Sequence, residues 1–286
     1  FVSEALMCPD VVEKQIDLNA SALADFQLHT LMEKPPADLI RIEKQMINRA
    51  LQKYKINVSH LNSYLKCPKN FYFNHILKVP AATNSNLNFG NVMHGTLETY
   101  FKKMKEHDAF PELNVLVSIF EQQMQYYRNA FGKKDYERML AYGQHLLPLY
   151  YTASINNWSK IVAIEQVIQN VIVSDIPVKG VIDKIEFEGK AANVVDYKTG
   201  KFRKEKFQRP KPKEEWKKQD APTFEEEYGG DYWRQGVFYK ILIDADNKNS
   251  WNVVTTEFDF IEPDKDSGKF HKQKVPIMKE DIALVK

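Results

Sequence analysis

Cysteine is scarce in this sequence, which holds only Cys8 and Cys67 among its 286 residues. Two cysteines cannot build a disulfide framework, and no Cys-x-x-Cys pair is present for zinc. A reducing compartment is therefore expected, and we predict a cytoplasmic location. Long apolar runs are also lacking, because runs such as Ile161 to Ile164 fall far short of the ~20 residues that cross a bilayer. We therefore expect no membrane partner.

Several common catalytic motifs are missing as well. The sequence has no GxSxG, no HExxH and no dinucleotide-binding GxGxxG motif. Gly90 and Gly95 have the spacing of a phosphate-binding loop, but Thr96 stands where its lysine is needed, so ATP hydrolysis is excluded. The sequence also lacks a signal peptide and an initiator methionine, and we expect it to be a piece of a longer protein.

The composition is that of a folded domain. Apolar residues make up 43% of the sequence, and 40 basic side chains nearly balance 38 acidic ones, for a net charge of +2. Such a chain can bury a hydrophobic core and is neither disordered nor a polybasic tail.

The hydrophobic pattern divides the chain into four regions. Residues 1–55 are loosely patterned and predicted to be helical, and we expect an appendage or connector there. Residues 56–158 form a predicted helical block that is rich in Tyr and Phe. Residues 160–199 change to β-branched strands, with a hairpin around Gly189. Residues 200–286 begin with a long polar loop, followed by a helix and a strand. This pattern predicts an α/β fold.

The hairpin carries the residues with the clearest chemistry. Asp196 and Lys198 are two positions apart in a strand, so both side chains point to the same face. With the turn near Gly189, Asp183 on the partner strand falls opposite about Val195 or Asp196. At ~4 Å and an effective dielectric of ~20, two like charges repel by about 4 kcal/mol, so paired carboxylates need a cation. Carboxylate oxygens suit Mg²⁺ or Mn²⁺, and Lys198 would then neutralise or orient a phosphate or the attacking water.

An ordinary strand end with a turn also explains the Asp-Tyr-Lys tripeptide, which arises by chance in lysine-rich chains. Asp183 favours a functional site. It follows the apolar run from Val178 to Ile182 in the middle of a strand, where Asp is disfavoured.

Four further residues fit the same site, and each also has an ordinary structural explanation. His94 lies in the helical segment FGNVMHGTLE, one position off the apolar stripe, where a packed or exposed histidine is common. Glu165 interrupts the apolar strand IVAIEQVI, as an outward-facing residue of a half-exposed strand also does. Gln235 and Tyr239 are four apart, on one face of a late helix, as in any amphipathic helix.

In their order along the chain, these residues resemble the RecB-like branch of the PD-(D/E)xK nuclease superfamily. The segment from Val58 to Pro80 is similar to the first motif of that branch, FGNVMHGTLE to its second, and QGVFY to its last. The hairpin GVIDKIEFEGKAANVVDYKTGK closely resembles its catalytic core. The resemblance covers about residues 56 to 262, and the ordered set of motifs is strongly specific. It implies a restriction-endonuclease-like α/β fold, with a central mixed sheet flanked by helices and a helical N-terminal block, in which residues 56–286 form the nuclease domain.

The resemblance also implies roles for individual residues. The metal would be held by His94, Asp183, Asp196 and the backbone carbonyl of Tyr197. The catalytic residues would be Lys198, Glu165, Asp183 and Asp196. Of these, Lys198 would be the catalytic lysine, and Glu165 a further metal ligand or a group that orients the attacking water. Gln235 and Tyr239 would position the nucleic-acid strand.

Members of this branch are often the C-terminal nuclease of a superfamily I helicase, or part of a helicase–nuclease repair complex. The resemblance therefore implies helicase motor domains as partners, in the same polypeptide or complex, and a role in DNA repair or recombination. The absence of an ATP-binding loop agrees with a motor that lies outside this sequence.

The loop after the catalytic strand is expected to contact the substrate. Residues 201–218 carry nine basic and three acidic side chains, with Phe202, Phe207 and Trp216 interleaved among them. This composition suits phosphate contacts and base stacking. A solvated surface loop explains the charge equally well, but adjacency to Lys198 favours function. The predicted contacts are Lys204, Lys206, Arg209 and Lys211.

Together these features predict a divalent-metal-dependent DNA nuclease, more an exonuclease than an endonuclease, acting on single-stranded DNA or duplex ends. The alternatives are a catalytically inactive nucleic-acid-binding module and a nuclease directed at RNA. The inactive module is less favoured, because every candidate active-site position holds a residue of the required type.

One departure from the family predicts an absence. Some relatives bind an iron–sulfur cluster through one cysteine in the first motif and three after the last. Cys67 matches the first position, but no cysteine follows Tyr239, so four thiolates are lacking. We therefore interpret Cys67 as a buried apolar residue and predict that the purified protein has no iron–sulfur cluster. A brown preparation with the visible absorbance of such a cluster would contradict this.

Overall fold

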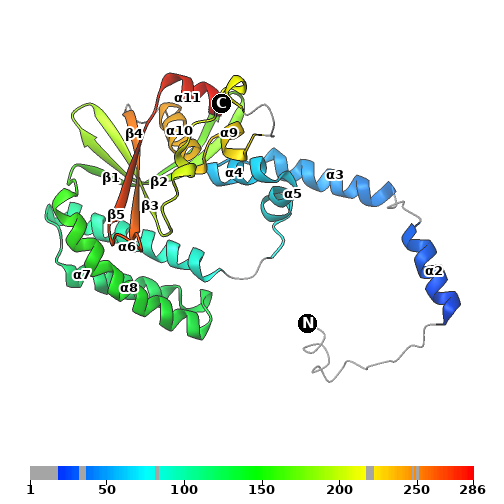
Figure 1. The fold of residues 1–286 in the computed structure, drawn as a ribbon, viewed down its shortest axis with the longest axis horizontal. Coiled ribbons are helices and arrows are strands. Elements are labelled where there is room, and N and C mark those ends of the chain that lie inside the picture. The colour runs from blue at the N-terminus through cyan, green and yellow to red at the C-terminus, as the bar shows by residue number, and fades with distance from the viewer. Residues whose placement is uncertain (1–18, 32–36, 81–83, 217–221, 247, 249–250) are drawn as a thin grey trace. The chain divides into compact units, whose positions relative to one another are not determined.

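The computed structural model describes residues 19–31, 37–80, 84–216, 222–246, 248 and 251–286. The chain divides into two compact units, Phe1–Lys53 and Tyr54–Lys286. In the first unit, the described helices are α2 (Ala20–Leu31) and α3 (Ala37–Gln52) (Figure 1). They confirm a helical N-terminal region, of which residues 1–18 and 32–36 lie outside the described part of the chain.

Helices form the first part of the second unit. Their bounds are α4 (Val58–Lys66), α5 (Pro68–Phe71), the π-helix η1 (Tyr72–Ile76), α6 (Ser85–His107), α7 (Leu113–Tyr126), the 3-10 turn η2 (Arg128–Ala130), α8 (Lys133–Ser154) and the 3-10 turn η3 (Ile155–Asn157). The side chain of Asn84 starts α6, because its Oδ1 accepts hydrogen bonds from the first free backbone N–H groups of the helix. The helices α6, α7 and α8 bury one shared core, which confirms the predicted helical block.

Five strands follow, and they form one mixed sheet. Their bounds are β1 (Val162–Val173), β2 (Ile176–Glu188), β3 (Ala191–Lys198), β4 (Asn252–Pro263) and β5 (Phe270–Pro276). The strands lie in the order β1-β2-β3-β4-β5, and only the β3–β4 pair is parallel. In the β2–β3 turn, Gly189 has a φ of +60°, a conformation that glycine adopts at little cost. A parallel pair requires a crossover connection, and α10 (Asp231–Asp244) provides it.

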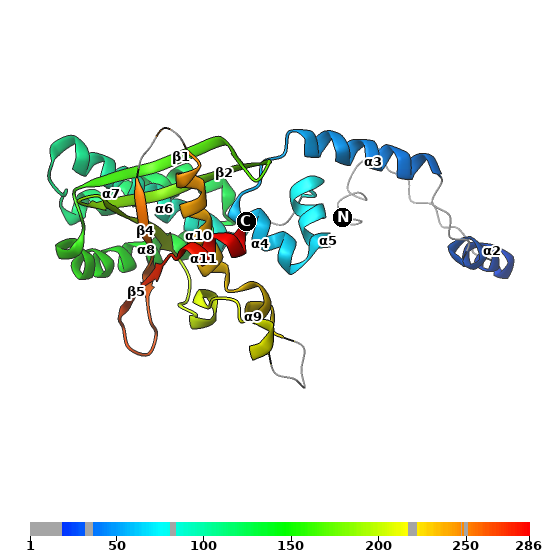
Figure 2. The same ribbon diagram turned by 90° about the horizontal axis from the view of Figure 1, so that it is seen from above.

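Helices cover both faces of this sheet (Figures 1 and 2). Because side chains alternate along a strand, β3 contributes to both layers. Val195 and Tyr197 pack into the core of α6, α7 and α8. Val194 packs with Phe238 and Leu242 of α10, and α11 (Lys279–Val285) contacts α10. The architecture is the predicted α/β arrangement, a mixed sheet flanked by helices.

Two elements at the end of the chain, β5 and α11, were not predicted. β5 is an edge strand with the sequence FHKQKVP. Of its apolar side chains only that of Val275 is buried, so the strand has a weak hydrophobic pattern. The polar loop after β3 also contains ordered structure: 3-10 turns at Lys204–Phe207 and Lys213–Glu215, and α9 (Phe224–Tyr228). A capping box of Thr223 and Glu226 begins α9.

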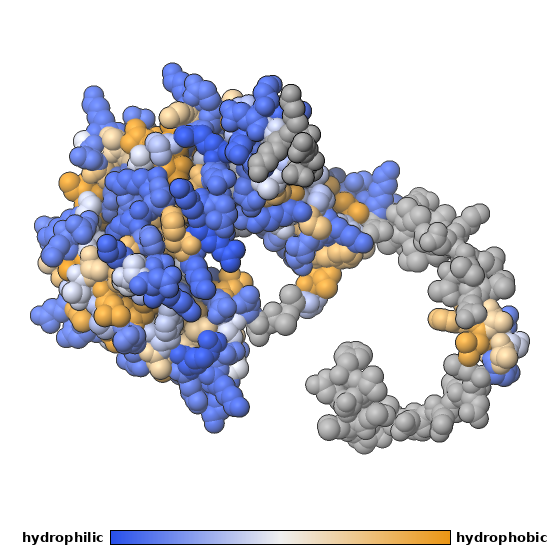
Figure 3. All heavy atoms as spheres, in the orientation of Figure 1, coloured by the Kyte–Doolittle hydropathy of each residue, from blue (hydrophilic) through white to orange (hydrophobic). Residues whose placement is uncertain are grey.

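Hydrophilic side chains cover most of the face of the second unit that Figure 3 shows. Some large apolar side chains of this unit are also exposed, including Tyr126 and Ile172. None of the described helices combines the length and the apolar character needed to cross a membrane.

Gly143 on α8 tests how closely α7 and α8 pack. A Cβ atom at this position would lie 2.0 Å from Cζ of Phe120, whose side chain is fully buried. Replacing an interior helical glycine by alanine normally stabilises a protein by about 0.5–1 kcal/mol. We predict that Gly143→Ala instead lowers the free energy of unfolding in urea by about 1–3 kcal/mol, because the Phe120 ring must move. Glu137→Ala, at an exposed position on the same helix, should change it by less than about 0.5 kcal/mol. Stabilisation by Gly143→Ala would contradict this packing.

Candidate functional site

Three carboxylates lie at one level across three neighbouring strands. Because Lys184 pairs with Val195 in the β2–β3 register, the preceding residue Asp183 lies opposite Asp196. The β1–β2 register brings Glu165 to the level of Asp183 on the other side. The sequence therefore predicted the meeting of Asp183 and Asp196 on adjacent strands, and the register selects Asp196 over Val195 as the opposite residue.

Asp183 is paired with a histidine from the α6 layer. Its Oδ2 lies 3.0 Å from Nδ1 of His94 and accepts a hydrogen bond of 3.0 Å from the backbone N–H of Tyr197. Burial by itself would raise the pKa of Asp183, but the neighbouring imidazole and the backbone donor lower it below its usual value. Burial likewise opposes the charged form of His94, and the Asp183 carboxylate raises the pKa of this histidine. The two residues therefore stabilise each other as an ion pair.

Asp196 is paired with the lysine two positions further along β3. Nζ of Lys198 lies 2.6 Å from Oδ2 of Asp196 and donates a 2.9 Å hydrogen bond to Oε1 of Gln235. Burial disfavours the Lys198 ammonium, but the Asp196 carboxylate more than offsets this and raises the pKa of Lys198. Lys198 is thus a half-buried, protonated cation whose ammonium also lies 4.9 Å from the centroid of the Tyr232 ring.

Gln235 and Tyr239 hold the other oxygen of Asp196. The amide of Gln235 donates to Oδ1 of Asp196 at 2.9 Å, and the hydroxyl of Tyr239 donates to the same atom at 2.6 Å. Their spacing of four residues places both on one face of α10. The resemblance implied contact with nucleic acid for this pair. In the structure their polar groups fix the orientation of the Asp196 carboxylate.

Glu165 sits in a strained backbone conformation. Its φ is +46°, a left-handed value that costs a non-glycine residue of order 1–3 kcal/mol and is found mainly where function requires it. Burial, followed by the nearby carboxylates of Glu98 and Asp183, raises the pKa of Glu165. Glu165, Glu98, His94 and Asp183 line a small cavity of about 10 Å³, which is near the size of one water molecule.

Glu98 is the residue at this site that was missed from the sequence. It lies four positions after His94 in FGNVMHGTLE, so the two share a face of α6. The spacing was visible in the sequence, but the same pattern occurs in any solvated helix. Only the packing of α6 against β1 brings Glu98 close to Glu165.

The donor atoms at this site fit a divalent metal ion in kind. Carboxylate oxygens, an imidazole nitrogen and the Tyr197 carbonyl are ligands that hard cations accept. Oδ2 of Asp196 is buried and has no hydrogen-bond partner of regular geometry among the described residues, and the Lys198 ammonium lies 2.6 Å from it. Within the described residues, no three His, Cys, Asp or Glu side chains are arranged to hold a metal, and His94 and Lys198 each neutralise one carboxylate. Metal binding would therefore compete with these two ion pairs.

Three of the four predicted phosphate contacts of the basic loop have partners within the protein. Arg209 makes a two-point ion pair with Asp281 at 2.7 and 2.9 Å, and Lys211 pairs with Glu226 at 2.7 Å. Nζ of Lys206 lies 4.6 Å from the centroid of the Tyr232 ring. Lys204 is exposed and has no ion-pair partner in the part of the chain that is described, whereas residues 217 and 218 fall outside that part.

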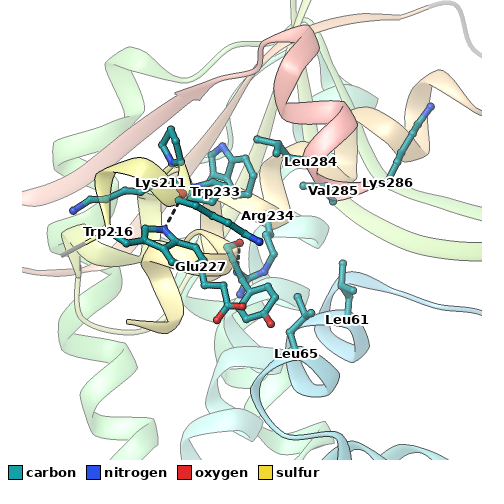
Figure 4. Close-up of a pocket in the computed structure, with 14 residues that line it drawn as sticks. Leu61, Leu65, Lys211, Trp216, Glu227, Trp233, Arg234, Leu284, Val285 and Lys286 are labelled. Carbon is teal, nitrogen blue, oxygen red and sulfur yellow. Dashed lines mark hydrogen bonds between the residues drawn. The ribbon is translucent and has the colours of Figure 1, made fainter. Parts of the chain in front are cut away.

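The aromatic residues of this loop are also used within the protein. Phe202 and Phe207 stack on each other at 5.4 Å and pack against the core beneath α10. Trp216 lines a cavity of about 770 Å³ with Leu61 and Leu65 of α4, and Figure 4 shows this cavity. None of the three carboxylates lines it. The loop therefore reaches a cavity separate from the carboxylates.

The interpretation of Cys67 as a buried residue was wrong, because the structure exposes it. Cys67 lies between α4 and α5, where its Sγ accepts a 3.4 Å hydrogen bond from the backbone N–H of Asn70 and caps α5. A capping position lies at a helix end, so its side chain need not enter the core.

The comparisons with known proteins identify a family. The model of the PD-(D/E)XK nuclease superfamily matches residues 55–281. Among the curated proteins, none matches the chain. A solved structure titled "Crystal structure of SSO0001" is similar over 68% of this chain and 70% of that chain, with 14% sequence identity and a TM-score of 0.27. This likeness is too weak to support an argument.

The two ion pairs predict opposite effects on metal affinity. Asp183→Asn and Asp196→Asn each remove a ligand charge, so calorimetric titration with Mn²⁺ should show a loss of affinity of about tenfold or more. Lys198→Ala removes the cation that competes for Asp196, so its Mn²⁺ affinity should be equal or higher. Asp175→Asn, at an exposed position in the β1–β2 turn, is the matched control and should bind as the wild type does. Equal losses in the Lys198 and Asp variants would refute this assignment.

Proposed function

The chain belongs to the PD-(D/E)XK nuclease superfamily, and from this membership we propose that it is a divalent-metal-dependent deoxyribonuclease. Members of the superfamily are nucleases that act on nucleic acid and generally use divalent ions such as Mg²⁺ or Mn²⁺. The finer parts of the proposal are DNA as the substrate and exonucleolytic attack on single strands or duplex ends. We assign this activity to residues 56–286, with residues 1–55 as a connector.

The observation that supports the proposal most strongly is the meeting of Asp183, Asp196 and Lys198. Two carboxylates and an ammonium occupy neighbouring positions on two strands, and all three are largely buried. Burying charges is costly, and hydrophobic residues would stabilise the sheet at least as well. A buried group of this kind is therefore better explained by chemistry than by stability.

Each residue has a role that its contacts support. A bound divalent ion supplies Lewis-acid stabilisation of the negative charge on the phosphate. Asp183, Asp196, His94 and the carbonyl of Tyr197 would hold this ion. Lys198 would donate a hydrogen bond to a phosphate oxygen and stabilise the charge that develops during attack. The raised pKa of Glu165 suits a group that orients the attacking water and accepts its proton.

We also propose a cellular setting for this activity. The motif order of the RecB-like branch supports a role in DNA repair or recombination in the cytoplasm, beside helicase motor domains. The sequence has no ATP-binding loop of its own, so strand separation would have to come from such a partner.

The test is a cleavage assay on matched substrates. Labelled single-stranded DNA, circular single-stranded DNA, blunt duplex DNA and RNA are each incubated with Mg²⁺, with Mn²⁺ or with a chelator. We predict cleavage of linear DNA that the chelator abolishes, with circular DNA resistant. Lys198→Ala should lower kcat by about 10²–10³-fold, since it removes a donor that acts on the developing charge.

The control for this variant is Lys190→Ala, which removes an exposed lysine in the β2–β3 turn and should cut at the wild-type rate. Metal-independent cleavage, or normal cleavage by Lys198→Ala, would refute the proposed active site. Binding without cleavage would support the inactive module, and cleavage of RNA alone would support the third candidate.

A further inference from the structure

A cavity of about 340 Å³ adjoins the candidate active site, and no role has yet been assigned to most of its lining. It lies between the start of α4, the β1–β2 hairpin and α10. Gln235 and Tyr239 line it, and the same two side chains hold Oδ1 of Asp196 by hydrogen bonds of 2.9 and 2.6 Å. A molecule in this cavity would therefore touch residues that touch the catalytic carboxylate.

The position of the cavity depends on the close approach of β2 to α10. A Cβ atom on Gly180 would lie 2.6 Å from Cδ2 of Leu242, which is fully buried, so only glycine lets the strand pack this closely. The isolated parallel bridge between Ile56 and Val178 fixes the segment before α4 to the same hairpin. Three segments far apart in the sequence are thus held around one cavity.

The lining combines apolar surface with free hydrogen-bonding groups. Phe238 is a buried apolar side chain of the cavity lining, and Val181 is an exposed one. The Oδ1 of Asn57 accepts a 2.8 Å hydrogen bond from the backbone N–H of His60, which fixes the amide and leaves its NH₂ group as a donor. Gln169 is exposed, and in the described residues no partner holds its amide. Amides of this kind match the donor and acceptor pattern at the edge of a nucleobase.

The cavity also contains one cation without a partner. No ion pair involves Lys179 in the part of the chain that the structure describes, although most lysines around the site are paired. After burial and the neighbouring His75, Lys179 and Lys78 both contribute to lowering the pKa of His60 to about 4, so this neighbourhood is electropositive. An unpaired ammonium beside apolar surface and amides has the chemistry to bind a nucleotide: phosphate, sugar and base.

We propose that this cavity binds an unpaired nucleotide next to the phosphate that is cut, with Lys179 on its backbone phosphate and Gln169 and Asn57 at the edge of its base. The proposal rests on the proposed nuclease function, and it adds a physical reason why the enzyme would prefer single-stranded to duplex substrate. The edge of a base is free for these amides in a single strand, whereas in a duplex it is occupied by the opposite strand. The cavity therefore favours single-stranded substrate.

Two single variants test the proposal in the full chain. Lys179→Gln and Gln169→Ala change exposed or half-exposed side chains, so both should fold as the wild type does. Each should raise KM for single-stranded DNA by about 5- to 10-fold with kcat within about twofold, since the lost contacts bind the neighbouring nucleotide and not the reacting atoms. Cleavage of duplex DNA should change less, so the preference for single strands should fall.

A binding measurement without cleavage separates the phosphate contact of Lys179 from the base contact of Gln169. With chelator present, the affinity for a labelled single-stranded 15-mer is measured at several salt concentrations. Loss of one phosphate contact in Lys179→Gln should reduce the slope of log affinity against log salt by about 0.7, and Gln169→Ala should leave the slope unchanged. Lys190→Gln and Gln122→Ala make the same chemical changes at exposed positions outside the cavity and should match the wild type.

The outcomes distinguish failure of this inference from failure of the proposed nuclease function. If the wild type cuts DNA but both cavity variants keep wild-type KM and salt slope, the inference is overturned and the nuclease proposal stands. If the wild type cuts no nucleic acid under any metal condition, the nuclease proposal fails and this inference fails with it. A change in KM with an unchanged salt slope in Lys179→Gln would overturn the phosphate contact assigned to Lys179.

Discussion

The site is built around two carboxylates that are held side by side and must be neutralised. Asp183 and Asp196 occupy facing positions on β2 and β3, and at such separations their repulsion amounts to several kcal/mol. His94 reaches Asp183 from one layer of helices, and Lys198 reaches Asp196 from the same strand. The sheet supplies the acids, but only the packing of α6 against it supplies the histidine. The packing of α6 on the sheet thus completes the Asp183–His94 ion pair, while α10 contributes neutral donors to Asp196.

Buried charge also lies beside the site, on β4 and β2. Asp259 pairs in register with Tyr197, is fully buried, and is held by the Tyr150 hydroxyl at 2.8 Å and by the Lys272 ammonium at 2.9 Å. Nearby, the buried ammonium of Lys184 lies 2.9 Å from Glu186. The contacts of Asp259 tie α8 and β5 to β4, which pairs with β3 of the site. A strand whose neighbour is fixed in this way has little freedom to move, which is the condition for aligning reacting groups.

The site combines backbone strain with partly or fully buried charge. Glu165 keeps a left-handed backbone beside two other carboxylates, although a glycine would adopt the same φ without cost. The remaining core of α6, α7 and α8 is apolar and aromatic, with Phe101, Phe120 and Trp158 among its members. Its apolar burial offsets the cost of the charged group at the sheet, so stability and chemistry are supplied by different parts of one domain.

The sequence by itself determined four of the five strands described, the main helices and the pairing of the site acids. Strand periodicity is a property of the backbone, so Asp196 and Lys198 had to share a face, and a turn at Gly189 placed Asp183 near Asp196. Only the tertiary structure decided which cation each charged residue meets. Arg209 pairs with Asp281, 72 residues away, and Glu98 joins the site because α6 packs on β1. Exposure of Cys67 was decided in the same way, by its place at the end of a helix. Local geometry repeats every two or 3.6 residues and can be followed along a sequence, whereas ion pairs and burial depend on distances between segments that only the folded chain brings together.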